Sequence, residues 1–374
     1  MAFGSMAQMR RYCDKVFAKD ARLGTMTDGR EDPTVPLGAI LSSWQWGMVR
    51  RLPSTEQVGD LLMDLRWRAL VGLKTQDGGS PDTAARVLDS LSIGEWNEML
   101  LEDFFIARRA GMLSDDGPYG KRCAVVDLNE LFKSEKVHCP ACQVREKTVV
   151  GPDGEKRKIL EYYHQAAALS WVSGEVPFVI GWELLLPGEG ELTAALRLLR
   201  RLLPHVSRSL DLVMGDGMYC CRPFFETVCG AGLDALAISS GVTEMDEEIE
   251  LLIKTAPARL MPGIHVAVWQ MESEAWFSDL KRKLQVIHCE RRYAAPAWKH
   301  ERKQLRVVTS APVEVLPAGQ GWKIGRCRWK IENGTFNALT ADYFLTHNYR
   351  NSTQAIVGLL ALRSFAHFLT RAYY

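Results

Sequence analysis

The chain has 374 residues, of which 47% are hydrophobic and 24% charged, so it can bury one large core or two to three smaller ones. The formal net charge of +1 gives no global support for nucleic-acid binding, and any such function must rest on local patches. The longest apolar run, at 355–362, is too short to span a bilayer, and no secretory signal pattern is present. Nine cysteines without such a signal are typical of reduced thiols, so we expect a cytoplasmic protein with no membrane partner.

Residues 1–115 are predicted to form a helical N-terminal domain. Ser54 and Ser80 stand as capping residues before helix starts, and apolar residues within 83–113 recur at helical spacing. This pattern is typical of an accessory domain and also of a domain that binds DNA ends. The spacing alone does not decide between the two.

Beyond residue 116 the apolar pattern becomes that of strands alternating with helices. The predicted strands are 123–127, 162–171, 177–186, 210–216 and 234–239, and the predicted helices are 190–203 and 223–230. Three strands, a helix, a strand, a helix and a strand follow the order of a ribonuclease-H-like core. We therefore expect an α/β fold in which a mixed sheet is flanked by helices.

The α/β core is predicted to be interrupted by an insertion. Residues 116–242 form its first part, 243–322 a β-rich insertion, and 323–374 its last, helical part. Strand-like segments in the insertion are 264–271, 284–289 and 305–310.

Three carboxylates stand at chemically meaningful places. Asp127 and Asp216 each close an apolar strand, and Glu332 lies on the first turns of a helix beyond the insertion. A single Asp at a strand end is more often a helix cap or a turn residue. Phosphodiester chemistry by a pair of Mg²⁺ ions, however, requires hard oxygen ligands that approach from different elements. We interpret the ordered set as a metal-binding catalytic site.

The sequences around these carboxylates, 127–134, 215–219 and 326–337, resemble one family. It is the bacterial insertion-sequence transposases of the DDE type, in the branch that cuts and pastes through hairpin ends. The resemblance covers about residues 80–370, and its most specific part is 326–349.

This resemblance implies a DNA transposase that cuts and joins transposon ends by hydrolysis and strand transfer. The implied cofactor is two Mg²⁺ (or Mn²⁺) ions held by Asp127, Asp216 and Glu332. The implied partners are double-stranded DNA, from transposon ends and target, and a second copy of the chain in a synaptic homodimer beside the bacterial nucleoid. Two alternatives stay open: a transposase-derived DNA-binding protein with weak or no catalysis, and a metal-dependent nuclease without strand transfer.

The chain departs from the branch's signature of Tyr, Arg, Glu and Lys along the last helices. Its Arg and Glu are matched, but Gly325 stands where the Tyr is expected. Leu339 takes the place of the Lys, or Thr340 does if Gly334 is counted as an insertion. In relatives the Tyr and Lys would contact phosphates near the cut, so other basic residues must replace them if this chain is active.

Basic and aromatic residues alternate within 281–306, which carries nine Lys or Arg against two Glu. This mixture suits a groove that tracks a DNA backbone while a ring stacks on an unpaired base, although a solvated charged surface is the alternative. The candidate DNA-binding residues are Arg291, Arg292, Trp298, Lys299, Arg326, Arg328 and Lys330. Trp298 is the candidate for stacking, with Trp269 and Trp276 as rivals.

Cys139 and Cys142 form a Cys-x-x-Cys pair with His138 and His164 nearby in the sequence. Such a pair with a histidine is half of a tetrahedral Zn²⁺ site. No second Cys-x-x-Cys follows, so two interpretations remain: a structural Zn²⁺ or free thiols in a hairpin element.

Overall fold

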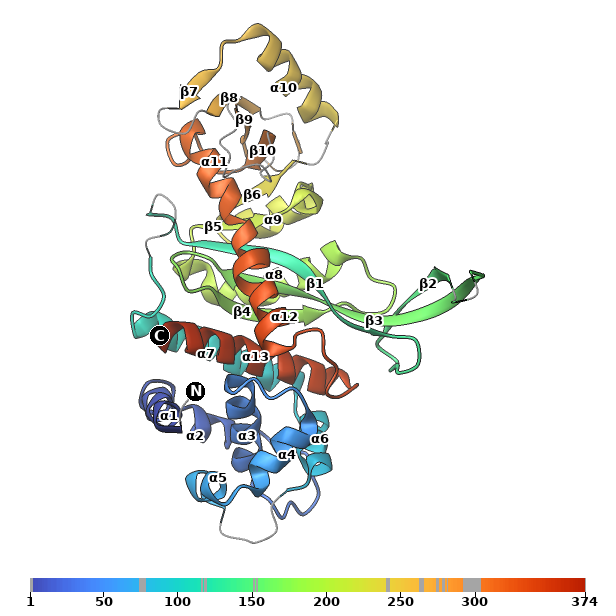
Figure 1. Ribbon diagram of the computed structural model, residues 1–374. Helices are drawn as coiled ribbons and strands as arrows, with labels where there is room; N and C mark the ends of the chain where they lie inside the picture. The colour runs from blue at the N-terminus through green and yellow to red at the C-terminus, as the bar shows by residue number, and fades with distance from the viewer. Residues whose placement is uncertain are drawn as a thin grey trace.

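A ten-stranded mixed sheet runs through the protein in the order β2-β3-β1-β5-β6-β10-β9-β8-β7, with β4 paired to β3. The computed structural model describes residues 3–373 except 74–78, 116, 118–119, 151, 153, 240–242, 262–265, 274–275, 278–279, 281 and 292–303. The molecule is elongated, with the N-terminal helices at one end, the strands after β6 at the other, and the central sheet between them (Figure 1).

The central strands have the order expected for a ribonuclease-H-like core. They are β1 (Cys123–Ser134), β3 (Lys156–Trp171), β4 (Phe178–Leu184), β5 (Leu212–Gly215) and β6 (Asp234–Ile238). β1, β5 and β6 run parallel, whereas β3 is antiparallel to both β1 and β4. The amphipathic helix α8 (Glu191–Val206) packs on β3 and β4, and α9 (Arg222–Gly230) packs on β6. Each of these elements was predicted, but β1 ends seven residues later and β3 begins six residues earlier than predicted. The prediction that Asp127 closes its strand was therefore wrong, because β1 continues to Ser134 along its pairing with β3.

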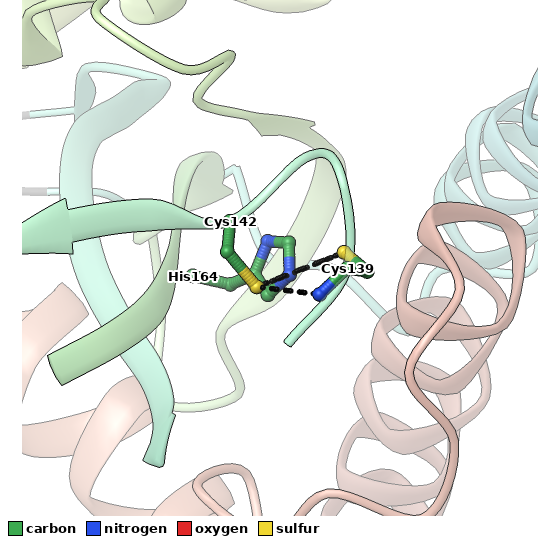
Figure 2. A group of neighbouring side chains, drawn as sticks. All are labelled: Cys139, Cys142 and His164. Atoms are coloured by element: carbon green, nitrogen blue, oxygen red, sulfur yellow. Dashed lines mark hydrogen bonds between the residues drawn. The ribbon is translucent and has the colours of Figure 1, made fainter. Parts of the chain in front are cut away.

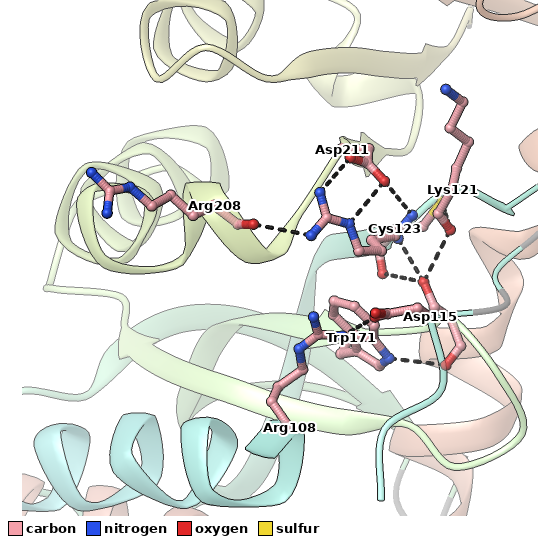
Figure 3. A network of polar contacts seen from close by, with 9 residues as sticks. Arg108, Asp115, Lys121, Cys123, Trp171, Arg208 and Asp211 are labelled. Carbon is pink, nitrogen blue, oxygen red and sulfur yellow. Dashed lines mark hydrogen bonds and ion pairs between the residues drawn. The ribbon is translucent and has the colours of Figure 1, made fainter. Parts of the chain in front are cut away.

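A polar network fixes where β1 enters the sheet (Figure 3). The Arg122 guanidinium donates to Asp211, just before β5, with a shortest N···O distance of 2.7 Å. The Ser173 hydroxyl accepts from the Cys123 backbone N–H at 2.6 Å, which ties the end of β3 to the start of β1. These contacts lie at strand ends and are made only in the register in which the apolar strand interiors pair, so they support that register.

β2 (Gln143–Val150) was not predicted from the sequence. It pairs with the outer half of β3 and forms a two-stranded arm that projects from the sheet (Figure 1). Most of its side chains are exposed, and charged residues interrupt any apolar alternation. A strand without a buried face gives no periodic signal.

The insertion continues the central sheet. It contains α10 (Thr243–Thr255), β7 (Arg259–Met261), β8 (Val266–Ser273), β9 (Leu284–Arg291) and β10 (Gln304–Thr309). β10 pairs antiparallel with β6, so the two sets of strands share one hydrogen-bond ladder. The rival stacking residues Trp269 and Trp276 are 6% and 2% exposed, and both belong to the core. The predicted residues Arg292, Trp298 and Lys299 lie outside the described residues.

Glu332 lies midway along a nearly continuous helical segment, not on its first turns as predicted. The segment consists of α11 (Ala318–Cys327), the π-helix η6 (Ile331–Phe336) and α12 (Asn337–Tyr343). It runs from the insertion back to the central sheet (Figure 1). The predicted domain boundary at 322/323 therefore falls inside α11.

The N-terminal residues are helical as predicted, and they share a core with the last helix. The helices are α1 (Phe3–Phe17), α2 (Lys19–Leu23), α3 (Leu37–Val49), α4 (Thr55–Met63), α5 (Leu65–Leu70), α6 (Pro81–Ser90) and α7 (Ile93–Arg109). The predicted caps are present: the Ser54 side chain accepts from Gln57 N–H and that of Ser80 from Thr83 N–H. α13 (Thr353–Tyr373) packs against α3, α6, α7 and β4.

Among the described helices, α13 is long and apolar enough to cross a membrane, but 83% of its apolar window is buried inside the protein. Residues 355–369 are buried without interruption. This is the environment of a core helix, whose apolar surface is satisfied by protein contacts.

A buried ion pair connects α2 to α7. Lys19 is 3% exposed and donates to Asp103, which is completely buried and also accepts from Arg22 at 2.6 Å. The Lys19 ammonium lies 4.1 Å from the centroid of the Phe365 ring on α13. Three helices distant in sequence thus meet at one pair of charges.

Asp103→Ala is expected to lower the free energy of unfolding by about 3–5 kcal/mol, because it leaves a buried ammonium without its carboxylate. Glu146→Ala, which breaks an exposed pair with Lys158, is the control and should cost less than about 1 kcal/mol. Urea denaturation of both variants measures the difference. Equal, small losses would show that the Asp103 pair adds nothing beyond an exposed one.

Candidate functional site

Parallel pairing places Asp127 and Asp216 at the same edge of the sheet. Val125 on β1 is opposite Met214 on β5. Asp127 follows Val125 by two residues, and Asp216 follows Met214 by two residues. Asp127 lies within β1, is buried, and accepts a hydrogen bond from the Leu128 N–H at 2.9 Å. Asp216 follows β5 and caps the next turn by accepting from the Met218 N–H at 2.9 Å.

Arg328 joins Asp127 to Glu332. Its Nη1 atom is 3.5 Å from Asp127 Oδ2 and 2.7 Å from Glu332 Oε1. The Arg328 side chain is 8% exposed, so the charge is held inside the site and not at the surface. The Glu332 side chain is 46% exposed, so this carboxylate is accessible to solvent.

The three carboxylates influence one another electrostatically. The pKa of Asp127 is raised to about 7, mainly by burial and in smaller part by the negative charges of Asp216 and Glu332, whereas the Leu128 N–H and Arg328 lower it. Among the described residues, the group of three potential metal ligands whose atoms all lie within 4.8 Å of one another is a separate Cys and His group, so the three carboxylates do not converge to that extent. They form an acidic cluster in which one guanidinium is the neighbouring positive charge.

Glu191 and Tyr219 belong to this site and were not predicted. The Tyr219 hydroxyl donates to Glu191 Oε1 at 3.0 Å, and burial raises the pKa of Glu191, with Asp216 raising it further. A Cβ on Gly215 would lie 2.5 Å from Tyr219 Cβ, so glycine is required for Tyr219 to fold back over the strand end. Glu191 begins α8 behind Gly190, a position that resembles an ordinary helix start in sequence.

The basic residues near Glu332 divide between two faces of the helix. Arg328 and Glu332 are four residues apart and lie on the face toward Asp127. Arg326 and Lys330 lie on the other face, where they line a pocket of about 680 Å³ with Trp322 and Trp329. The Arg326 guanidinium lies 5.8 Å from the ring centroids of both tryptophans. Lys330 also donates to the backbone oxygen of Gly174 at 3.0 Å.

Arg291, the described member of the predicted basic insertion set, is on β9 beside this pocket. Its guanidinium lies 5.6 Å from the Trp322 ring centroid. The structure thus brings Arg291 and Arg326 to the same tryptophan, although they are distant in sequence.

The departures from the family signature have a packing explanation. A Cβ on Gly325 would lie 2.8 Å from Val307 Cγ2 and 3.1 Å from Leu305 Cδ2, so a tyrosine on this face of α11 would have to displace these two side chains of β10. Leu339 is completely buried, whereas Thr340 is exposed. Neither position offers a cation to DNA.

Cys139 and Cys142 lie beyond the end of β1, apart from the carboxylates. His164 on β3 contacts both thiols, whereas His138 is exposed and stacks on Tyr162 with a centroid distance of 4.6 Å.

A family model described as a transposase DDE domain matches residues 178–369. The match includes Asp216 and Glu332 but begins after Asp127, which joins them through the pairing of β1 with β5. No curated protein matches the chain.

Asp127→Asn is expected to stabilise the metal-free protein at pH 8. Because the folded-state pKa of about 7 is above the ordinary 3.8, the folded state binds more protons between these values, and stability falls as pH rises through this window. Removing the charge should raise the free energy of unfolding by about 2–4 kcal/mol at pH 8 and by little at pH 4. Urea denaturation in EDTA at the two pH values measures this.

Asp211→Asn is the control with the opposite sign. The hydrogen bonds from Arg122 lower the pKa of Asp211, so its ionised form stabilises the fold above the ordinary pKa, and the variant should lose stability at pH 8. Stabilisation of Asp127→Asn to the same extent at both pH values would contradict the electrostatic explanation.

Proposed function

The chain belongs to the transposase DDE domain family, and on this premise we propose that it cuts transposon-end DNA and joins it to a target. The observation that carries the proposal is the cluster of Asp127, Asp216 and Glu332, drawn from two neighbouring strands and one helix. The negative charges of Asp216 and Glu332 add to the rise in the pKa of Asp127 that burial mainly causes, and a bound cation would neutralise this charge.

The donor set fits divalent metal ions. Carboxylate oxygens are the hard ligands that Mg²⁺ and Mn²⁺ prefer, and the three side chains approach from separate elements. Asp127, Asp216 and Glu332 would hold two such ions, which would supply an activated attacking oxygen and charge stabilisation for the leaving oxygen. The protein's part is to fix these oxygens, which the sheet register and the packing of η6 achieve.

Arg328 has two roles in this proposal. Without metal it is the counter-charge of Asp127 and Glu332, at 3.5 and 2.7 Å. With metal ions bound at these carboxylates, the Arg328 guanidinium would be available to bind a DNA phosphate with paired N–H donors. The acidic site is therefore kept folded before its substrate arrives.

The pocket of Trp322, Arg326 and Trp329 receives the DNA beside the cut. The cationic side chains hold phosphates, and the rings offer a stacking surface for an unpaired base. In this proposal the pocket takes over the phosphate contacts that the signature Tyr and Lys make in relatives. The packing around Gly325 and Leu339 leaves no room for those two residues here.

The finer terms of the proposal follow the resemblance. We infer that cleavage passes through hairpin ends, that two copies pair the two DNA ends, and that the helices of residues 1–115 contribute to end binding. The protein would act in the bacterial cytoplasm at the nucleoid.

The test uses full-length protein, a duplex that carries the DNA flanking the source gene, and Mg²⁺, with products mapped at nucleotide resolution. The wild type should nick the element end, form a hairpin and join the end to a second duplex. Asp127→Ala, Asp216→Ala and Glu332→Ala should each reduce cutting to background while they retain DNA binding, because the metal ligands are removed and the basic surface is not.

Asp342→Asn is the matched control, since Asp342 is an exposed carboxylate on α12 of the same helical segment. It should cut like the wild type. Metal-dependent cutting retained by Asp216→Ala would overturn the site, and wild-type binding without any cutting would favour a transposase-derived DNA-binding protein. Cutting without joining would identify a nuclease.

The pocket makes a separate prediction about DNA affinity. Arg326→Ala should weaken binding to all sequences and reduce the salt slope of log K by about 1. Trp329→Ala should leave that slope unchanged and cost about 1–3 kcal/mol on DNA with an unpaired base. Arg200→Ala, at an exposed position on α8, is the control. Unchanged affinity in both pocket variants, measured by fluorescence anisotropy against salt, would exclude the pocket from the DNA path.

A further inference from the structure

Cys139, Cys142 and His164 meet at the root of the β2–β3 arm, in the loop after β1 and on β3. Their three side chains point toward one another (Figure 2). His164 Nε2 lies 3.2 Å from Cys139 Sγ and 3.3 Å from Cys142 Sγ, and the two sulfurs are 3.7 Å apart. It is the one group among the described residues in which three metal-ligating atoms all lie within 4.8 Å.

These distances are close to the edges of a tetrahedral zinc site. Zn–S and Zn–N bonds of about 2.3 and 2.0–2.1 Å at tetrahedral angles give an S···S edge of about 3.8 Å and S···N edges of about 3.6 Å. The observed S···S distance of 3.7 Å agrees with that edge, and the S···N distances of 3.2 and 3.3 Å are slightly shorter. A disulfide would need the sulfurs at about 2.05 Å, and both cysteines are free.

The group is buried on one side and open on the other. His164 is 1% exposed and Cys142 5%, and the imidazole is positioned by the Phe132 ring at a centroid distance of 5.2 Å. The Cys139 backbone N–H donates to Cys142 Sγ at 3.2 Å, which fixes the position of that sulfur. Cys139 itself lines a pocket of about 840 Å³ between this loop and residues 346–352, which gives an ion a path to the sulfurs.

The location suggests what an ion would stabilise. β1 ends opposite Tyr162 on one edge of β3, and β2 begins opposite Tyr163 on the other edge, so residues 135–142 must cross the strand. The two cysteines are in this crossing segment, and His164 is on the crossed strand. Beyond it the arm is only two strands, an arrangement that is marginally stable without support.

We propose that Cys139, Cys142 and His164 bind one Zn²⁺, with a solvent molecule from the adjoining pocket as the fourth ligand. The ion fixes the crossing segment to β3 and thereby holds the arm in register with the sheet. The site is structural and separate from the carboxylates, so the proposal does not depend on the proposed function.

The first experiment measures metal in the full-length protein. Wild type purified without chelator should carry about one zinc per chain, and cobalt substitution should give the thiolate-to-metal absorption of a sulfur-ligated tetrahedral site. Cys139→Ser and His164→Ala should lose the bound metal and this absorption. Cys229→Ser is the matched control, since Cys229 is a partly exposed thiol on α9, and it should keep both.

The second experiment tests the role in the arm and does not rely on a variant that folds. Wild type treated with a chelator should be cleaved by a protease within residues 143–160 several-fold faster than untreated protein, and added Zn²⁺ should reverse the change. Less than half an equivalent of zinc, with no uptake of added Zn²⁺ and no cobalt band, would overturn the proposal and leave a hydrogen-bonded thiol cluster. Bound zinc whose removal leaves arm cleavage unchanged would overturn the stabilising role.

Discussion

The parallel pairing of β1 with β5 is the constraint on which the candidate active site depends. It brings Asp127 and Asp216 to one edge of the sheet although 88 residues separate them in the sequence, and Glu332 then reaches the same edge from the long helical segment. A shift of one residue in this register would turn one aspartate to the opposite face. The contacts of Arg122 with Asp211, at the start of the pair, therefore matter for chemistry that occurs at its other end.

The sequence predicted the elements that bury an apolar face. β1, β3 to β6, α8 and α9 each show an apolar pattern of the right period, and their order was enough to predict the mixed sheet. β2 and α10 were missed because charged, exposed residues dominate them. That the insertion extends the central sheet was also not predictable, since the pairing of β10 with β6 joins strands separated by more than 60 residues.

The site was predictable as a set of carboxylates but not as an arrangement. Nothing in the sequence places Arg328 between Asp127 and Glu332, and the Tyr219 contact with Glu191 arises only because Gly215 allows a close approach. The π-helix at 331–336 adds a residue to the turn that carries Glu332. Counting along a regular helix therefore misassigns the face of residues beyond it, where Leu339 is buried and Thr340 is exposed.

The shared core of α13 with α3, α6 and α7 has a consequence for synthesis on the ribosome. The first seven helices are complete at Arg109, but the helix that covers them starts at Thr353. At about 5–20 residues per second, the ribosome needs roughly 10–50 seconds to synthesise the residues between Arg109 and the end of α13, and the apolar surface of the first helices stays exposed during this time. A nascent chain must be protected from aggregation during this interval, and a message truncated before α13 yields a product whose N-terminal helices never bury that surface.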